Sequence, residues 1–197
     1  MRTLIIFFST IVFISCNNSK EVKDPKEVQS KIESKHPASF NSSVQSAMDS
    51  YGALTEAFVN WDSSAVDRHS QELKVKLDSI NFYGFNPETI TAYVDTLDLA
   101  RKDLQAMTTN KDITSKRHDL NALTGHLYSF LEQVKFDANK VYLQQCPMAF
   151  NDTVAAAWLS ETDSIRNPYL GLHHPKYGKA MLECGSTIST IDFTSKK

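Results

Sequence analysis

The chain has 197 residues, of which 41% are hydrophobic, and this size and composition predict one domain with its own core. Its formal net charge of −2 excludes the strongly basic surface that nucleic-acid binding needs, so we expect no nucleic-acid partner. The chain has only six glycines, which argues against a turn-rich β-sandwich and favours long helices.

The N-terminal segment, residues 1–15, is predicted to be a lipoprotein signal peptide. A positively charged start precedes an apolar run over residues 4–14, which is too short to cross a bilayer as a helix. Ser15 and Cys16 follow, and a small residue just before a cysteine at this place resembles a lipobox, although the usual leucine is replaced by Phe13. We therefore expect a lipid on Cys16 to anchor the protein in the bacterial cell envelope, on the periplasmic side or in the outer membrane. The alternative is an ordinary cleaved signal peptide with a chance cysteine.

Residues 16–42 are predicted to form a flexible tether between membrane and domain. The segment is rich in Lys, Glu and Ser and contains Pro25 and Pro37. Its few apolar residues could not offset the entropy cost of ordering it.

The folded domain is predicted to begin at residue 43 and to extend to residue 197. Four segments repeat apolar residues every three or four positions, as amphipathic helices do. Asp62 or Ser64 can cap the second segment, and Asn86 followed by Pro87 marks the start of the third. Short links predict an up-down four-helix bundle. The four apolar stripes are Val44, Ala47, Met48, Tyr51, Leu54 and Phe58; Val66, His69, Leu73, Leu77 and Ile80; Ile90, Tyr93, Leu97, Ala100, Leu104 and Met107; and Ile113, Leu120, Leu123, Leu127, Phe130, Leu131 and Val134.

Helical periodicity is lost after about residue 140. Prolines and glycines recur through the last part of the chain and mark turns, while Val141-Tyr142-Leu143 is β-prone. Trp158 and nearby tyrosines indicate that this part is ordered. We therefore predict an all-α fold, in which an irregular, turn-rich C-terminal extension, about residues 141–197, packs on the bundle.

The extension carries the residues with distinctive chemistry. Cys146 and Met148 are two positions apart, and Met181 and Cys184 are three apart. Thiolate and thioether sulfurs are soft donors that select Cu(I), and His173 and His174 could add nitrogen donors. These residues predict a soft-metal site of two to four sulfur ligands.

Two alternatives compete with this interpretation. In an oxidising compartment Cys146 and Cys184 are expected to form a disulfide, which would stabilise the protein by about 4 kcal/mol. Zinc, a weaker option than copper, could take the two cysteines together with His173 and His174 as a tetrahedral set. Residue spacing alone does not decide among them.

The extension also resembles the DUF3347 family of exported proteins, which is common in Bacteroidetes. The resemblance rests on the ordered motifs Val141-Tyr142, Cys-Pro-Met-Ala at 146–149, Trp-Leu-Ser at 158–160, Ile-Arg-Asn-Pro-Tyr at 165–169, Gly171 and Met-Leu-x-Cys-Gly at 181–185, with a similar helical layout before them. The DUF3347 domain also occurs attached to CusB-type copper/silver efflux adaptors. The resemblance therefore implies heavy-metal handling.

Taken together, these features predict a lipoprotein that binds Cu(I) or Ag(I), for sequestration or for delivery to an efflux adaptor protein. The alternative is a structural or interaction module whose extension is held by a Cys146–Cys184 disulfide. We do not expect an enzyme, because the sequence contains no nucleotide-binding glycine loop, nucleophile elbow or zinc-protease motif.

Overall fold

The computed structural model describes residues 34–194, so the signal peptide, Cys16 and most of the tether lie outside the described residues. Four helices come first: α1 (Ala38–Val59), α2 (Ser63–Asp78), α3 (Pro87–Thr109) and α4 (Ile113–Val134). The predicted set of four helices is thus confirmed. Between residues 34 and 194, no helix has both the length and the apolar character needed to cross a membrane.

Polar side chains fix the starts of three helices. Asp62, Asn86 and Asp112 each accept a hydrogen bond from a backbone N–H in the first turn of α2, α3 and α4, respectively. Pro87 stands at the first position of α3, as predicted. Helix α1 begins after Pro37 without a side-chain cap, and it includes the last residues of the segment that the sequence assigned to the tether.

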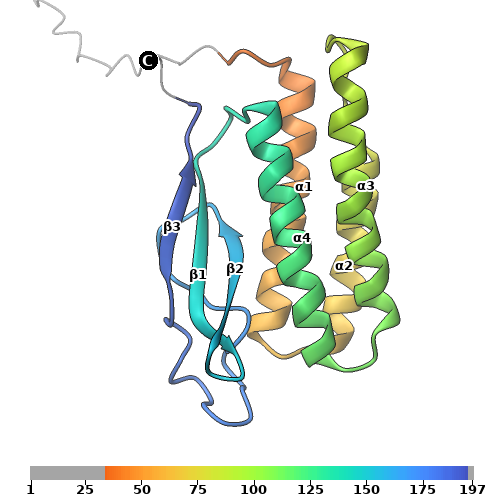
Figure 1. Cartoon of the computed structure of the whole chain (residues 1–197). Helices are drawn as coiled ribbons and strands as arrows, with labels where there is room; N and C mark the ends of the chain where they lie inside the picture. The colour runs from red at the N-terminus through yellow and green to blue at the C-terminus, as the bar shows by residue number, and fades with distance from the viewer. Residues whose placement is uncertain (1–33, 195–197) are drawn as a thin grey trace, which may run out of the picture. The chain divides into compact units, whose positions relative to one another are not determined.

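The helices pack as consecutive neighbours, α1 with α2, α2 with α3 and α3 with α4, and they alternate in direction (Figure 1). Most residues of the predicted apolar stripes lie in the core or pack against it, and Leu54, Leu73, Leu97 and Leu120 have no exposed surface. His69 and Ile90 are partly exposed and are not part of this core. Each fully buried leucine of this kind stabilises the fold by about 2 kcal/mol. The apolar side chains whose periodicity predicted the helices therefore hold the bundle together.

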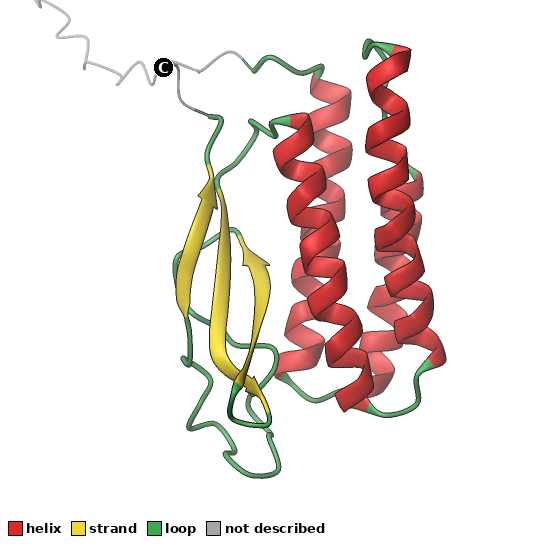
Figure 2. Cartoon of the chain, viewed as in Figure 1, coloured by secondary structure: helices red, strands yellow, loops and turns green. Residues whose placement is uncertain are grey.

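The predicted all-α class is wrong, because the extension contains a sheet. Strands β1 (Val141–Phe150), β2 (Val154–Ser160) and β3 (Ser186–Ile191) pair antiparallel in the order β2-β1-β3 (Figure 2). An extension packed on the bundle must find partners for its buried backbone N–H and C=O groups, and a ladder of strands supplies them. Between β2 and β3, residues 161–185 keep the irregular, turn-rich character that was predicted.

Strand β2 lies against α1 and α4, so the sheet covers one side of the bundle (Figure 1). Along the outer edge of β2, side chains from these helices take the place of a further strand. The Tyr51 hydroxyl accepts a hydrogen bond from the Leu159 N–H at 3.1 Å, and the Asn121 side chain accepts one from the Ala157 N–H at 2.9 Å. Burial raises the pKa of Tyr51 to about 12. The bundle thereby satisfies and protects this edge of the sheet.

Candidate functional site

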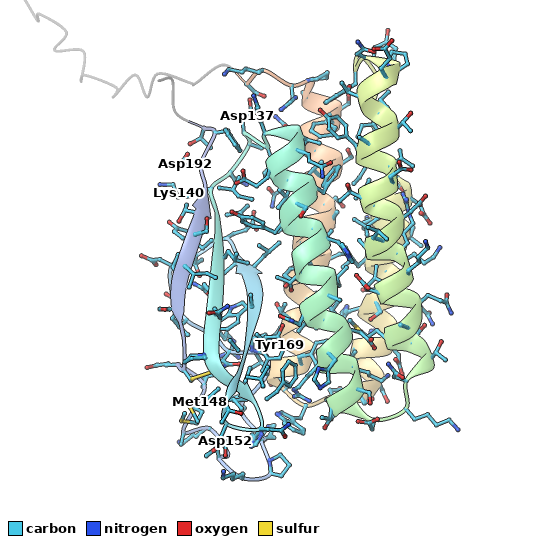
Figure 3. The ribbon with its side chains drawn as sticks, in the orientation of Figure 1. Asp137, Lys140, Met148, Asp152, Tyr169 and Asp192 are labelled. Carbon is cyan, nitrogen blue, oxygen red and sulfur yellow. A yellow bond between two sulfur atoms is a disulfide. The ribbon has the colours of Figure 1, made fainter. Side chains whose placement is uncertain are left out.

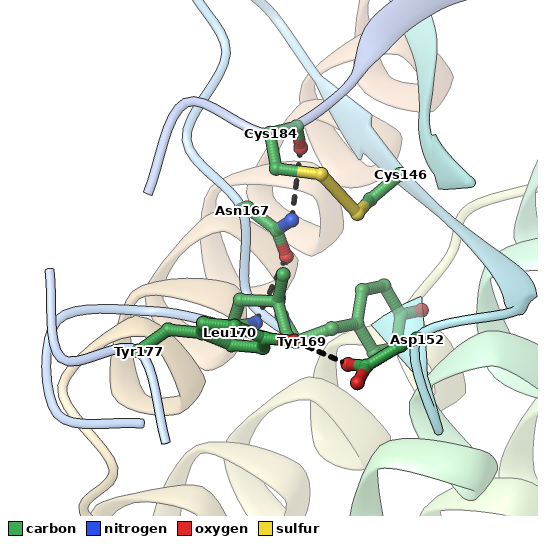
Figure 4. The surroundings of a disulfide bond; sticks show 7 residues. All are labelled: Cys146, Asp152, Asn167, Tyr169, Leu170, Tyr177 and Cys184. Carbon is green, nitrogen blue, oxygen red and sulfur yellow. Dashed lines mark hydrogen bonds between the residues drawn. A yellow bond between two sulfur atoms is a disulfide. The ribbon is translucent and has the colours of Figure 1, made fainter. Parts of the chain in front are cut away.

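The two cysteines of the extension meet in space and form a disulfide (Figure 4). Cys146 lies in the central strand β1, and its neighbour Gln145 pairs with Ser186 at the start of β3. Antiparallel pairing therefore carries Cys184, two residues before Ser186, to the side of Cys146. The Cα atoms of the two cysteines are 5.6 Å apart. Cys146 has no exposed surface, whereas Cys184 is partly exposed.

Asn167 is the main polar contact of the Cys184 segment. Its side-chain N–H donates to the Cys184 carbonyl at 2.9 Å (Figure 4). Its backbone N–H donates to the Leu182 carbonyl at 2.8 Å. Its side-chain oxygen accepts hydrogen bonds from the N–H groups of Tyr169 and Leu170. Asn167 is completely buried, so its polar groups are all directed to protein partners.

Gly185 lets the chain pass close to β1 between the disulfide and β3. Its φ is +141°, in the region that favours glycine. A Cβ atom there would lie 2.8 Å from the Gln145 carbonyl oxygen and 2.8 Å from the ring of Trp158. Glycine is therefore required at position 185 by its backbone conformation and by the close approach of the chain to β1.

The two methionines of the predicted site are both partly buried. Met148 lies near the hairpin end of β1 (Figure 3), and Met181 lies in the irregular segment before Cys184. Both pack against the hydrophobic core that contains Cys146. The structure thus places the two cysteines together. Each of the two segments that carry a cysteine also carries one methionine at the edge of the core.

The two histidines occupy a different part of the extension. His173 is exposed, while the His174 ring lies edge-on to Trp61 and stacks on Tyr177. The Nδ1 atom of His174 accepts a hydrogen bond from the Lys176 N–H, and burial, together with nearby cations, lowers the pKa of His174. His174 is therefore used to hold its own loop.

In the part of the chain that the structure describes, Cys and His side chains are not gathered into a mixed set. Within the described range 34–194, no three or more His, Cys, Asp or Glu side chains gather closely enough to hold a metal ion. The predicted zinc set would need His173 and His174 beside Cys146 and Cys184, and the structure does not bring these four together.

Arg117 attaches the extension to the bundle, a role that the sequence did not indicate. Its guanidinium lies 3.8 Å from the centre of the Trp61 ring and donates to the backbone carbonyls of Tyr169 and Phe58. Burial lowers the pKa of Arg117 to about 9. An arginine within a helix gives no sequence signal for such a role, since both carbonyls are far away along the chain.

A cavity of about 240 Å³ lies between α1 and β2. Tyr51 and Trp158 line it, and so do Glu56 and Arg166, which form a bidentate ion pair. None of the residues that the sequence predicted as metal ligands lines this cavity. The cavity and the disulfide are therefore separate features of the sheet.

Comparison with known proteins shows that the helical region matches a protein family. Residues 47–139, which include most of the bundle, match the family described as "Protein of unknown function (DUF3347)", and the matched range ends just before β1. No curated protein and no solved structure matches the chain. The predicted resemblance to the DUF3347 family is thereby confirmed over the helical part of the chain.

Proposed function

We propose that the protein is a cell-envelope lipoprotein that binds a soft metal ion, Cu(I) or Ag(I), through Cys146 and Cys184. The observation that carries the proposal is the meeting of these two cysteines, which are 38 residues apart in sequence and 5.6 Å apart between Cα atoms. Two thiolates at this separation can bind one Cu(I) ion, for which soft sulfur ligands are selective. The activity is binding, and no catalytic step is part of the proposal.

The methionines support a soft site better than a hard one. Met148 and Met181 each lie within three residues of a cysteine and pack against the same hydrophobic core. Their neutral thioethers would hold Cu(I) while allowing its release, which suits sequestration or transfer to an efflux adaptor protein. A hydrophobic surround also limits the access of water to a bound ion.

The metal-binding form is the reduced one. Two electrons and two protons convert the disulfide to two thiols, and a thiol or dithiol compound can supply them. Cu(I) then replaces the thiol protons, since thiolate is the ligand. The disulfide is accordingly the metal-free state of the site.

The lipid anchor on Cys16 completes the proposal by keeping the protein at the membrane. Acylation of Cys16 would leave the 17 residues from Asn17 to Glu33 between the anchor and the described domain. The domain would stay close to an envelope partner that receives the ion. Labelling with a radioactive fatty acid, lost in Cys16→Ser, tests this part of the proposal.

Anaerobic titration with Cu(I) tests metal binding. The full-length chain is extracted in detergent, reduced, and titrated against a coloured Cu(I) chelator. We expect capture of about one ion, lost in Cys146→Ser and weakened in Met181→Leu. Met107→Leu is the matched control, because Met107 is buried in α3, outside the extension. Failure of the reduced protein to compete with the chelator would reject the proposal.

The disulfide itself favours a second function, an interaction module whose extension is held by the Cys146–Cys184 cross-link. Cys146 is fully buried, as expected for a structural cysteine. The native protein would then have a mass two daltons below that of the dithiol, and reduction would create no affinity for Cu(I).

A further inference from the structure

Cys184 is held in place by hydrogen bonds that do not involve its sulfur. The Asn167 side chain donates to the Cys184 carbonyl (Figure 4). The Asn167 backbone N–H donates to the Leu182 carbonyl. We propose that Asn167 is a positioning residue that keeps Cys184 beside Cys146 when the disulfide is open. The cysteines then alternate between a disulfide and a preformed dithiol. This inference rests on the proposed metal-binding function, for which the dithiol is the active form.

Asn167 can position Cys184 because Asn167 is itself fixed. Its side-chain oxygen accepts from the N–H of Tyr169 at 2.8 Å and from the N–H of Leu170 at 3.1 Å. Tyr169 is in turn fastened at both ends, since its hydroxyl donates to the Ala157 carbonyl and its own carbonyl accepts from Arg117. A continuous set of hydrogen bonds therefore connects Cys184 to β2 and α4.

Cys146 is fixed independently of Cys184. It lies in the central strand, where it pairs with Ala156 of β2, and its neighbour Gln145 pairs with Ser186 of β3. Both sulfur-bearing segments thus keep their positions without the S–S bond. Two thiols held in this way have a high effective concentration toward each other, and they do not have to find each other again to bind one ion.

The exposure of the two cysteines sets the direction of reduction. Cys184 is partly exposed and Cys146 is fully buried, so a thiolate of a dithiol reductant attacks the Cys184 sulfur. The S–S bond breaks, and its electron pair passes to the Cys146 sulfur, which takes up a proton from solvent. The second thiolate of the reductant then attacks the mixed disulfide and releases the Cys184 thiolate. The reductant leaves as its own disulfide.

Asn167→Asp isolates the proposed contact. Aspartate keeps an oxygen that accepts from the Tyr169 N–H, but it replaces the N–H donor that reaches the Cys184 carbonyl. Asn121→Ala is the matched control, because Asn121 also makes a side-chain bond to the sheet backbone, at Ala157, and does not touch Cys184. In the full-length chain, near-ultraviolet circular dichroism verifies the fold of each variant.

The readout is the thiol–disulfide equilibrium of the full-length chain with glutathione. Loss of positioning lowers the effective concentration of the thiols, so the constant for disulfide formation should fall about tenfold in Asn167→Asp, equivalent to about 30 mV. The control should change it by less than about twofold. An unchanged constant in a folded Asn167→Asp overturns the inference.

A second variant covers the case in which Asn167→Asp does not fold. In Asn167→Ser, the hydroxyl can still accept from the Tyr169 N–H but is too short to reach the Cys184 carbonyl. The same tenfold fall is expected, and an unchanged constant in this variant also overturns the inference.

Cu(I) titration of the reduced proteins separates this inference from the proposed function. If wild-type protein binds Cu(I), Asn167→Asp should weaken its affinity about tenfold. If wild-type protein binds no Cu(I) but the glutathione constant still falls, Asn167 positions the thiols and the metal function is wrong. If wild-type protein binds Cu(I) and neither quantity changes in the variant, the metal function stands and the role of Asn167 is rejected.

Discussion

Replacing Cys184 by serine should lower the free energy of unfolding by about 4 kcal/mol and leave the native fold in place. The cross-link spans 38 residues, and in the chain-entropy model a bridge of that span removes enough conformations from the unfolded chain to account for this value. Serine is close to cysteine in size, and position 184 is partly exposed, so the hydroxyl does not need a buried partner. The native contacts of Asn167 and of β3 do not depend on the sulfur.

Urea unfolding followed by tryptophan fluorescence measures this difference, with and without dithiothreitol. The variant should match reduced wild-type protein, because both lack the bridge, and both should unfold at lower urea than oxidised wild-type protein. Equal free energies for the variant and the oxidised wild-type protein would refute the entropic argument. Loss of the strand signal in the circular dichroism of the variant without urea would show that the sheet itself depends on the bridge.

Three further predictions concern the sheet and its contact with α1. Gly185→Ala should destabilise the protein by more than about 2 kcal/mol, because of its close contacts, whereas Gly178→Ala, which has open space around it, should cost about 1 kcal/mol; urea midpoints compare the two. The hydrogen bond from Arg166 lowers the pKa of Glu56, so this pair stabilises the fold above the ordinary pKa of 4.5 and stops doing so as pH falls through the lowered value. Wild type should therefore be the more stable at pH 7, by less than about 1 kcal/mol because both side chains are nearly half exposed, and the melting temperatures of wild type and Glu56→Gln should converge as pH falls through the lowered pKa. Tyr51→Phe should cost about 1–3 kcal/mol in urea unfolding, because the buried Leu159 N–H loses its acceptor.

The helical half of the fold could be predicted because its signals are local. Apolar periodicity and the caps at Asp62 and Asn86 are both read within one or two turns of chain, and the structure confirms them. The sheet has weaker local signals. Strand β2 contains three consecutive alanines, which favour helix, and β1 contains Pro147, which cannot donate to a ladder. Clear β-propensity is confined to Val141-Tyr142-Leu143 at the start of β1 and to the Thr-Ile-Ser-Thr-Ile sequence of β3, and both runs are short.

The candidate site also has a part that could be predicted from the sequence and a part that could not. The residue types and the expected oxidising compartment predicted that Cys146 and Cys184 would meet, either as a disulfide or as ligands, and the structure has the disulfide. The positions of His173 and His174 could not be predicted, because they depend on the loop that contacts Trp61 at the end of α1. Asn167 belongs to the Ile-Arg-Asn-Pro-Tyr motif, but its contacts could not be predicted either, since its carbonyl partners are 15 and 17 residues further along the chain.

The contacts around Cys184 bear on what its disulfide is for. A cross-link is essential to the native state when it is the main connection of a segment to the rest of the fold. Here the segment is also held by Asn167, by the close contact of Gly185 with β1, and by the pairing of Ser186 with Gln145. The bridge therefore stabilises the protein chiefly by restricting its unfolded chain, and opening it should move the native backbone little. A bond that can open without loss of structure is suited to a site that exchanges a disulfide for a bound ion.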